Sequence, residues 1–337
     1  MPARAEDIPQ FVKTMKVSQK QRAYDHTKSI FSKWRQDTTS SLNFAFREDI
    51  KLWKGFRFIK DEDDRTATEN VLNEHYKILK EVYTNAVSMS SYPSMTAIEF
   101  AEWGVRSKLQ DDQNVNLAAF DRAYIAATLK LNPATDPPNI TRFEFLEILV
   151  RLADIKFIQT KQIKTYPDAT RKIIEDFIIK NFHPTEPWQE FRDKELWTLD
   201  VHDLFKANTQ RLEVIYRSFL SGVHKAMDLK DCQELCMRDE NLGVGEKDVT
   251  YAYGMSKATI GSEIPQYAGY MKLDYTEFLE FLARIATAKA RNNHAPQSMP
   301  LTQKIEEALD DILGSFGMVR NEVKIEDEEI SEEDDDY

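Results

Sequence analysis

The chain of 337 residues contains only two cysteines and ten glycines. Cys232 and Cys236 lie four positions apart, the spacing of one helix face, and a CxxxC pair alone does not make a metal site. We therefore expect two buried, reduced thiols, as in proteins of a reducing compartment. The shortage of glycine argues against a glycine-rich phosphate-binding loop and favours a helical protein.

Several motifs of enzymes and membrane proteins are also missing. The sequence has no P-loop, G-x-G-x-x-G, nucleophile elbow or HExxH, and its six histidines are scattered. It has no uncharged stretch long enough to span a bilayer and no apolar run near its start. We expect no enzyme activity, no catalytic residue, no cofactor, no metal ligand and no membrane insertion. A catalytic site assembled only in space is the alternative that this search leaves open.

Charge is distributed unevenly along the chain. The net charge is −12, and residues 305–337 alone contain 14 acidic and 2 basic residues, so residues 1–304 are neutral. Residues 1–35 carry a net positive charge, with 8 basic and 3 acidic residues. This balance does not favour nucleic acid as a partner. It predicts a basic arm at 1–24, a neutral body and an acidic tail at 318–337 that is disordered when free.

One ten-residue segment occurs twice. Residues 144–153 read EFLEILVRLA and residues 277–286 read EFLEFLARIA, identical at seven of ten positions. Leu79 and Tyr83 match Leu212 and Tyr216 at the same offset along the chain. The repetition predicts two duplicated helical modules, at 25–160 and 166–290. A helical-repeat solenoid is the alternative, although its units are usually much shorter than this offset.

Each module contains two helix–loop–helix segments that resemble the second half of an EF-hand. An apolar residue is followed four positions later by an acid: Met95 and Glu99, Ile140 and Glu144, Met227 and Asp231, Leu273 and Glu277. The resemblance implies an all-α fold of two tandem EF-hand-like pairs, in which the apolar residues of each pair form a short two-stranded β-bridge.

The residues expected to bind calcium are missing from these loops. Counting back from Glu277 puts Gln266, Ala268 and Tyr270 at positions that need oxygen ligands, with Met271 in place of the turn glycine. In the loop before Glu144, Pro138 occupies that glycine position and cannot supply the turn. We expect degenerate EF-hands that bind no calcium. A calcium-responsive regulator remains the alternative.

The acids of each pair are 45 and 46 positions apart, Glu99 to Glu144 and Asp231 to Glu277. Such long pairs, preceded by aromatic helices, are similar to the EF-hand proteins of ciliary and flagellar axonemes. The resemblance implies a non-catalytic scaffold in the cytoplasm or cytoskeleton that binds tubulin or other axonemal proteins, on the microtubule or inside it. A soluble cytoplasmic adaptor is a further alternative.

Hydrophobic periodicity predicts the helices. We expect a helix over 19–35, one long helix over 66–87, and, after a linker at 291–300, an amphipathic helix at 301–317. That last helix is a candidate for docking onto the chain itself through Ile305, Leu309, Ile312, Leu313 and Phe316. The candidate partner-binding residues are the arm cations and two tryptophans of the repeated aromatic segment: Lys13, Lys16, Lys20, Arg22, Trp53 and Trp197.

Overall fold

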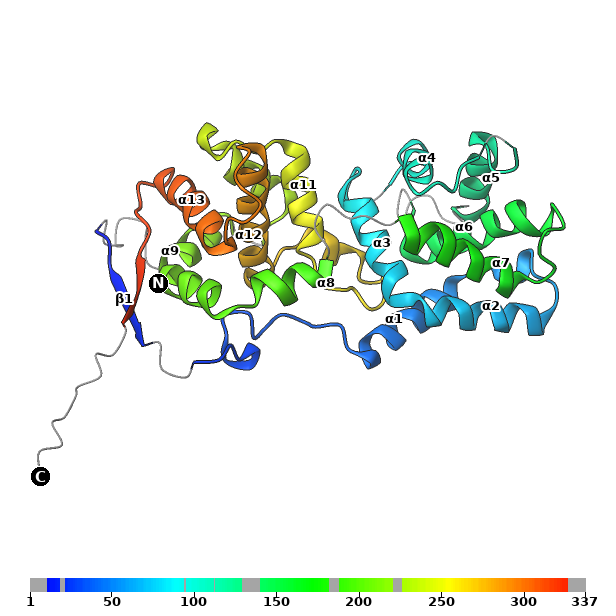
Figure 1. Ribbon diagram of the computed structural model, residues 1–337, viewed down its shortest axis with the longest axis horizontal. Coiled ribbons are helices and arrows are strands. Elements are labelled where there is room, and N and C mark those ends of the chain that lie inside the picture. Colours follow the sequence, from blue (N-terminus) through cyan, green and yellow to red (C-terminus); the bar gives the residue numbers. More distant parts are fainter. Residues whose placement is uncertain are drawn as a thin grey trace, which may run out of the picture. The chain divides into compact units, whose positions relative to one another are not determined.

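The structure, a computed structural model, describes residues 11–18, 22–93, 95–111, 113–128, 140–181, 188–220 and 226–326. These described residues are mostly helical, with thirteen α-helices and two short strands (Figure 1). None of their helices is long and apolar enough to cross a bilayer. The expected all-α class is therefore confirmed at this coarse level.

The chain divides into two compact units. Unit 1 comprises residues Met1–Trp34, Gln189–Ala252 and Leu273–Tyr337, and unit 2 comprises Arg35–Trp188 and Tyr253–Lys272. The chain therefore passes between the units four times. A segment from the second half of the sequence, residues 253–272, belongs to the unit built from the first half.

Unit 2 is built around one fully enclosed helix, α6 (Arg142–Ala153), in which every residue from 142 to 150 is buried. Its neighbours in contact include α1, α3, α5 and α7. The remaining helices of this unit are α1 (Thr39–Leu52), α2 (Glu62–Glu74), α3 (Tyr76–Ser88), α4 (Ala97–Arg106), α5 (Leu117–Ala127) and α7 (Tyr166–Ile173). Two π-helical turns extend α6 and α7, at Asp154–Ile158 and Ile174–Ile179.

Unit 1 has a similarly buried helix, α12 (Tyr275–Asn292), with α13 (Leu301–Gly314) packed against it. Figure 1 shows these two helices side by side. The other helices of the unit are α9 (Leu199–Ser218) and α10 (Leu229–Met237). Two helices contain a boundary between the units: α8 (Trp188–Phe191) and α11 (Glu246–Met255).

The two strands come from opposite ends of the chain. β1 (Thr14–Ser18) pairs in parallel with β2 (Glu322–Glu326), in a register that sets Lys16 beside Lys324 (Figure 1). The expectation of a disordered tail is therefore wrong for residues 322–326. Alternating Val323 and Ile325 give this segment a strand pattern that its acidic composition concealed. Residues 327–337 lie outside the described residues.

The expected helix over 19–35 is wrong for the described part of that range. Only His26–Lys28 form one 3₁₀ turn. Asp25 accepts hydrogen bonds from the backbone N–H of Thr27 (2.9 Å) and from its hydroxyl (2.6 Å), and the backbone N–H of Ile30 donates to His202 Nδ1 (3.1 Å). These side-chain acceptors take the bonds that a helix would otherwise make.

The single helix expected over 66–87 is also wrong, because the chain forms α2 and α3 with a break at His75. The backbone at His75 (φ −99°, ψ 5°) leaves the helical region, and its imidazole Nδ1 donates to the Val71 carbonyl oxygen (2.9 Å). The Val71 carbonyl oxygen therefore accepts from both the His75 ring and the His75 backbone N–H, the latter at a lengthened 3.3 Å.

Candidate functional site

The four acids that resemble the last ligand of an EF-hand loop serve as helix caps in this structure. Each carboxylate accepts a hydrogen bond from the backbone N–H three residues earlier, at 2.8 Å for Glu99, 2.8 Å for Glu144, 2.9 Å for Asp231 and 3.0 Å for Glu277. These are capping boxes, in which the carboxylate fixes the start of its helix. Among the described residues, no group of three or more His, Cys, Asp or Glu could hold a metal ion.

The apolar residues before these acids also have defined backbone contacts. Met227 and Leu273 form an isolated antiparallel bridge, in which the Leu273 N–H donates to the Met227 carbonyl oxygen (2.7 Å). Tyr216 Oη donates to the Leu273 carbonyl oxygen (2.9 Å). In unit 2, Tyr83 Oη donates to the Ile140 carbonyl oxygen (3.2 Å), which is the same contact at the offset of the sequence repeat.

A buried polar cluster in unit 2 joins segment 253–272 to the helices of the first half. Arg142 forms a two-pronged ion pair with Asp49 (2.6 and 2.9 Å), and the two side chains are 2% and 1% exposed. The same guanidinium donates to the Ile260 carbonyl oxygen (2.9 Å). Because a buried charge is costly without partners, this pair both requires and fixes the segment beside it.

Glu263 is the second buried carboxylate of this cluster. It accepts hydrogen bonds from Tyr270 Oη (2.8 Å) and the backbone N–H of Arg142 (2.6 Å). Tyr83 Oη lies 3.1 Å from Glu263 and shares its one proton between this carboxylate and the Ile140 carbonyl oxygen. Burial raises the pKa of Glu263 to about 7, and the neighbouring Asp49 adds to that rise while the Arg142 charge opposes it. The group therefore titrates close to neutral pH.

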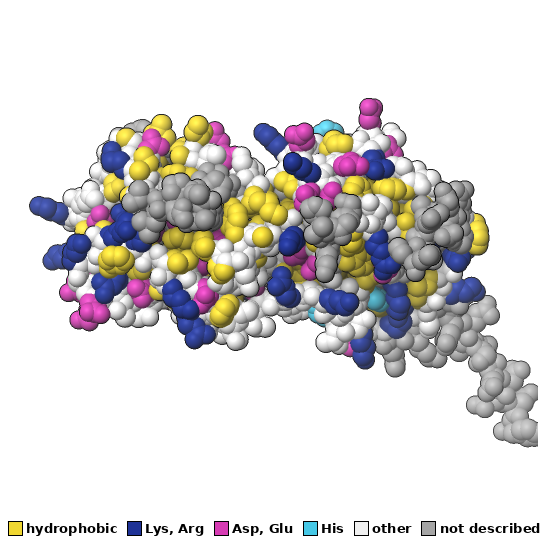
Figure 2. All heavy atoms as spheres, turned by 180° about the vertical axis from the view of Figure 1, so that it is seen from behind, with side chains coloured by type: hydrophobic (Ala, Val, Ile, Leu, Met, Phe, Trp, Pro, Cys, Tyr) yellow, Lys and Arg dark blue, Asp and Glu magenta, His cyan; other side chains and the backbone are white. Residues whose placement is uncertain are grey.

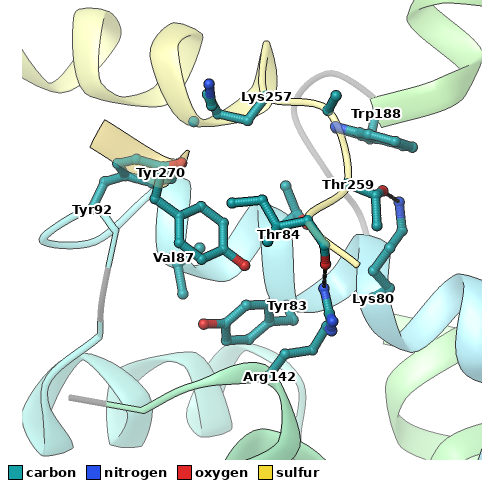
Figure 3. Close-up of a pocket in the computed structure, with 13 residues that line it drawn as sticks. Lys80, Tyr83, Thr84, Val87, Tyr92, Arg142, Trp188, Lys257, Thr259 and Tyr270 are labelled. Atoms are coloured by element: carbon teal, nitrogen blue, oxygen red, sulfur yellow. Dashed lines mark hydrogen bonds between the residues drawn. The ribbon is translucent and has the colours of Figure 1, made fainter. Parts of the chain in front are cut away.

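Beside this cluster is a cavity of about 20 Å³, bordered by Tyr83, Tyr92, Arg142 and Tyr270 (Figure 3). A space of this size holds about one water molecule and no organic substrate. At its edge, Lys80 donates to Thr259 Oγ1 (3.0 Å). These contacts join segment 253–272 to the helices of the first half of the chain.

A larger, open groove lies beside β1 in unit 1. It has a volume of about 590 Å³ and is lined by residues 13–15 of the arm, by α9 from Lys206 to Glu213, and by Asn321. Lys13, Lys16 and Lys206 are exposed. We call the exposed cations Lys13, Lys16, Lys206 and Lys324 the arm surface. On the face of the molecule in Figure 2, basic side chains are dispersed among other residue types, with no continuous basic band.

Two amide side chains hold the arm surface in place. The backbone N–H of Lys13 donates to Asn321 Oδ1 (3.0 Å), and its carbonyl oxygen accepts from the Glu322 N–H (3.0 Å). The buried Asn208 of α9 accepts from the Asn321 N–H (2.7 Å) and donates to the Asn321 carbonyl oxygen (3.2 Å). The start of β2 is thereby bonded both to the arm and to α9.

The other candidate partner residues lie in different surroundings. Arg22 forms an ion pair with Asp203 (2.7 Å), and Trp197 packs edge-on against His26 with ring centroids 4.6 Å apart. Trp53 is 6% exposed and belongs to the core of unit 2. Lys20 lies outside the described residues. The arm surface therefore contains Lys13 and Lys16 of the original candidates.

The candidate self-docking helix is α13. Ile305, Leu309, Ile312 and Leu313 are buried in unit 1, where α13 contacts α12 and α9. Phe316 is half-buried, with the Arg238 guanidinium 4.7 Å from the centre of its ring.

Sequence reasoning did not identify the buried cluster of unit 2 or the amides Asn208 and Asn321. Arg142 and Glu263 are far apart in the sequence and belong to no motif, so only a contact between distant segments could reveal them. Comparisons of the chain with models of protein families, with curated proteins and with solved structures found no match.

Proposed function

We propose that this protein is a non-catalytic structural protein that binds other proteins, with the arm surface as one contact. The observation that carries the proposal is that Lys16 belongs to the ordered strand β1, while Lys13, the residue before that strand, borders an open groove and is bonded to Asn321. A strand held in this way loses less conformational entropy on binding than a free terminus does. The partner that suits these cations is an acidic protein surface.

We further propose that the two modules are duplicated EF-hand-like pairs that no longer bind calcium. The four capping acids support this, because their carboxylates are already engaged with the chain. Ion pairs that recur at the offset of the repeat support the duplication: Glu147 pairs with Arg151 and Glu280 pairs with Arg284, each at 2.8 Å. The resemblance to axonemal EF-hand proteins suggests the ciliary microtubule as the acidic partner, bound on the lattice or inside it.

Co-sedimentation of the full chain with assembled microtubules tests this function. We expect the double change Lys13→Glu and Lys16→Glu to weaken binding about tenfold, since each lost surface contact contributes up to about 1 kcal/mol. Lys230→Glu with Lys247→Glu is the matched control, because both lysines are exposed in unit 1 outside the arm surface. Failure to pellet, or equal pelleting of the arm variant, would overturn the microtubule proposal. A calcium-dependent change in pelleting would favour a regulator.

A further inference from the structure

Segment 253–272 is attached to the start of α6 through Arg142. The guanidinium donates to the carbonyl oxygens of Ile260 (2.9 Å) and Gly261 (3.3 Å), the first of which is drawn as a dashed line in Figure 3. The backbone N–H of Arg142 donates to Glu263 (2.6 Å), which is 2% exposed. Because Glu263 belongs to the segment and is buried by its attachment, a change in the charge of Glu263 acts directly on that attachment.

Two buried carboxylates lie near this one guanidinium. The Arg142 guanidinium directs four hydrogen bonds to Asp49 and to the carbonyl oxygens of Ile260 and Gly261. Its charge is therefore paired with Asp49, whereas Glu263 receives the backbone N–H of Arg142. An ionised Glu263 adds a second negative charge to the same buried place, and such a charge is costly.

The hydroxyl of Tyr83 shows how a proton on Glu263 is bonded. Tyr83 Oη lies 3.1 Å from Glu263 and 3.2 Å from the Ile140 carbonyl oxygen, and it has one proton to donate. When Glu263 is ionised, that proton must be shared between the two acceptors. When Glu263 is protonated, Glu263 donates to Tyr83 Oη and Tyr83 donates to Ile140, so both bonds form. The hydrogen-bond geometry thus favours the neutral acid.

The titratable and charged groups around Glu263 come from three helices and from the segment itself: Asp49 of α1, Tyr76 and Tyr83 of α3, Arg142 and Glu144 of α6, and Tyr267 and Tyr270. Burial raises the pKa of Tyr83 and of Tyr270 well above 10, so these hydroxyls stay neutral. Lys80 and Lys257 border the adjoining cavity, where Lys80 pairs with Asp37 and Lys257 donates to the Lys272 carbonyl oxygen.

We propose that Glu263 is a proton-dependent switch for segment 253–272: the neutral acid holds the segment in unit 2, and loss of the proton releases the segment while the helices of the unit stay folded. Release brings the charged carboxylate into water, where it is solvated. The segment runs from the end of α11 to the start of α12, so its release frees the chain between these two helices. The switch does not depend on the arm surface.

Proton linkage gives the size of the expected effect. Glu263 has a pKa of about 7 when the segment is attached, and its ordinary value is 4.5. The attached state holds the proton more tightly, so attachment is strongest below pH 4.5 and weakens as the pH rises through 7. Between about pH 6 and 8, the ratio of released to attached segment should increase about tenfold.

Hydrogen exchange of the full chain, corrected for intrinsic rates, tests the switch. The reporters are the Arg142 N–H, which bonds to Glu263, and the Gly269 N–H, which bonds to the Gln266 carbonyl oxygen within the segment (2.8 Å). We expect both amides to exchange about tenfold faster at about pH 8 than at about pH 6. Their exchange should also depend less on denaturant than that of amides in the middle of α6, because release exposes less surface than unfolding does.

Two variants complete the test. Glu263→Gln keeps a neutral side chain of the same shape and should exchange at the same corrected rate at both pH values. Glu48→Gln is the matched control, because the half-buried Glu48 accepts from Ser262 Oγ of the same segment (3.0 Å), and it should keep the pH response. The switch is overturned if the wild-type reporters show no pH response or if the response persists in Glu263→Gln. A denaturant dependence equal to that of α6 overturns it too, since the whole unit then unfolds together.

Discussion

Asn208 and Asn321 exchange hydrogen bonds: the side chain of Asn208 accepts from the Asn321 N–H and donates to the Asn321 carbonyl oxygen. Asn208 is fully buried in α9, and Asn321 directly precedes β2. The neutral side-chain amide of Asn208 thus bonds to both the N–H and the carbonyl oxygen of Asn321, the residue before β2. This contact decides where the arm surface is held in unit 1.

Replacing this amide should loosen the strand pair. Asn208→Ala leaves a buried N–H and a buried carbonyl without their partner, so we expect a loss of about 1–3 kcal/mol in unfolding free energy. Hydrogen exchange should show faster exchange in β1 and β2. Gln210→Ala is the control, since Gln210 is exposed on the same helix. Unchanged exchange in both strands would show that Asn208 does not hold them.

The ion pairs of unit 2 should differ strongly in their contribution to stability. Asp49→Ala leaves the Arg142 guanidinium buried without its carboxylate, and we expect a loss of about 3–5 kcal/mol. Glu74→Ala is the matched comparison, because the Glu74–Arg171 pair (2.7 Å) is exposed and such pairs contribute at most about 1 kcal/mol. Denaturant unfolding of the two variants measures both losses, and equal losses would contradict the burial argument.

Glu263 should make unit 2 less stable as pH rises. Its folded pKa of about 7 lies above its ordinary value of 4.5, so the folded state holds the proton more tightly. The stabilisation is complete below pH 4.5 and is lost towards pH 7, by on the order of 3 kcal/mol. Glu263→Gln should remove this dependence in unfolding experiments between about pH 5 and 8. A wild-type-like pH profile in that variant would assign the dependence to another group.

His202 should give unit 1 the opposite dependence. Burial lowers the pKa of His202 below 6.5, because a charged ring is poorly solvated there. The neutral ring also accepts the Ile30 N–H, which a protonated ring cannot do. The unfolded state then binds the proton more readily, so stability present above pH 6.5 is lost as pH falls. Protection of the Ile30 amide, corrected for intrinsic exchange, should decrease between about pH 7.5 and 5.5. Constant protection would contradict this assignment.

Local patterns in the sequence predicted much of the helical structure. The apolar spacing of residues 301–317 indicated α13, which begins at Leu301 as expected and ends three residues earlier, at Gly314. The strand pair could not be predicted, since five residues near each terminus become a strand only when they meet. The role of Glu263 could not be predicted either, because its hydrogen-bond partners come from α3 and α6, which are distant in the sequence, as well as from Tyr270.

The parallel direction of β1 and β2 also determines how the protein responds to a pulling force. The start of β1 and the end of β2 lie at opposite ends of the strand pair. A force that draws residues 11 and 326 apart therefore slides one strand along the other and loads their hydrogen bonds together, instead of opening them one at a time. Tension applied between the two termini meets its first resistance as shear along this ladder.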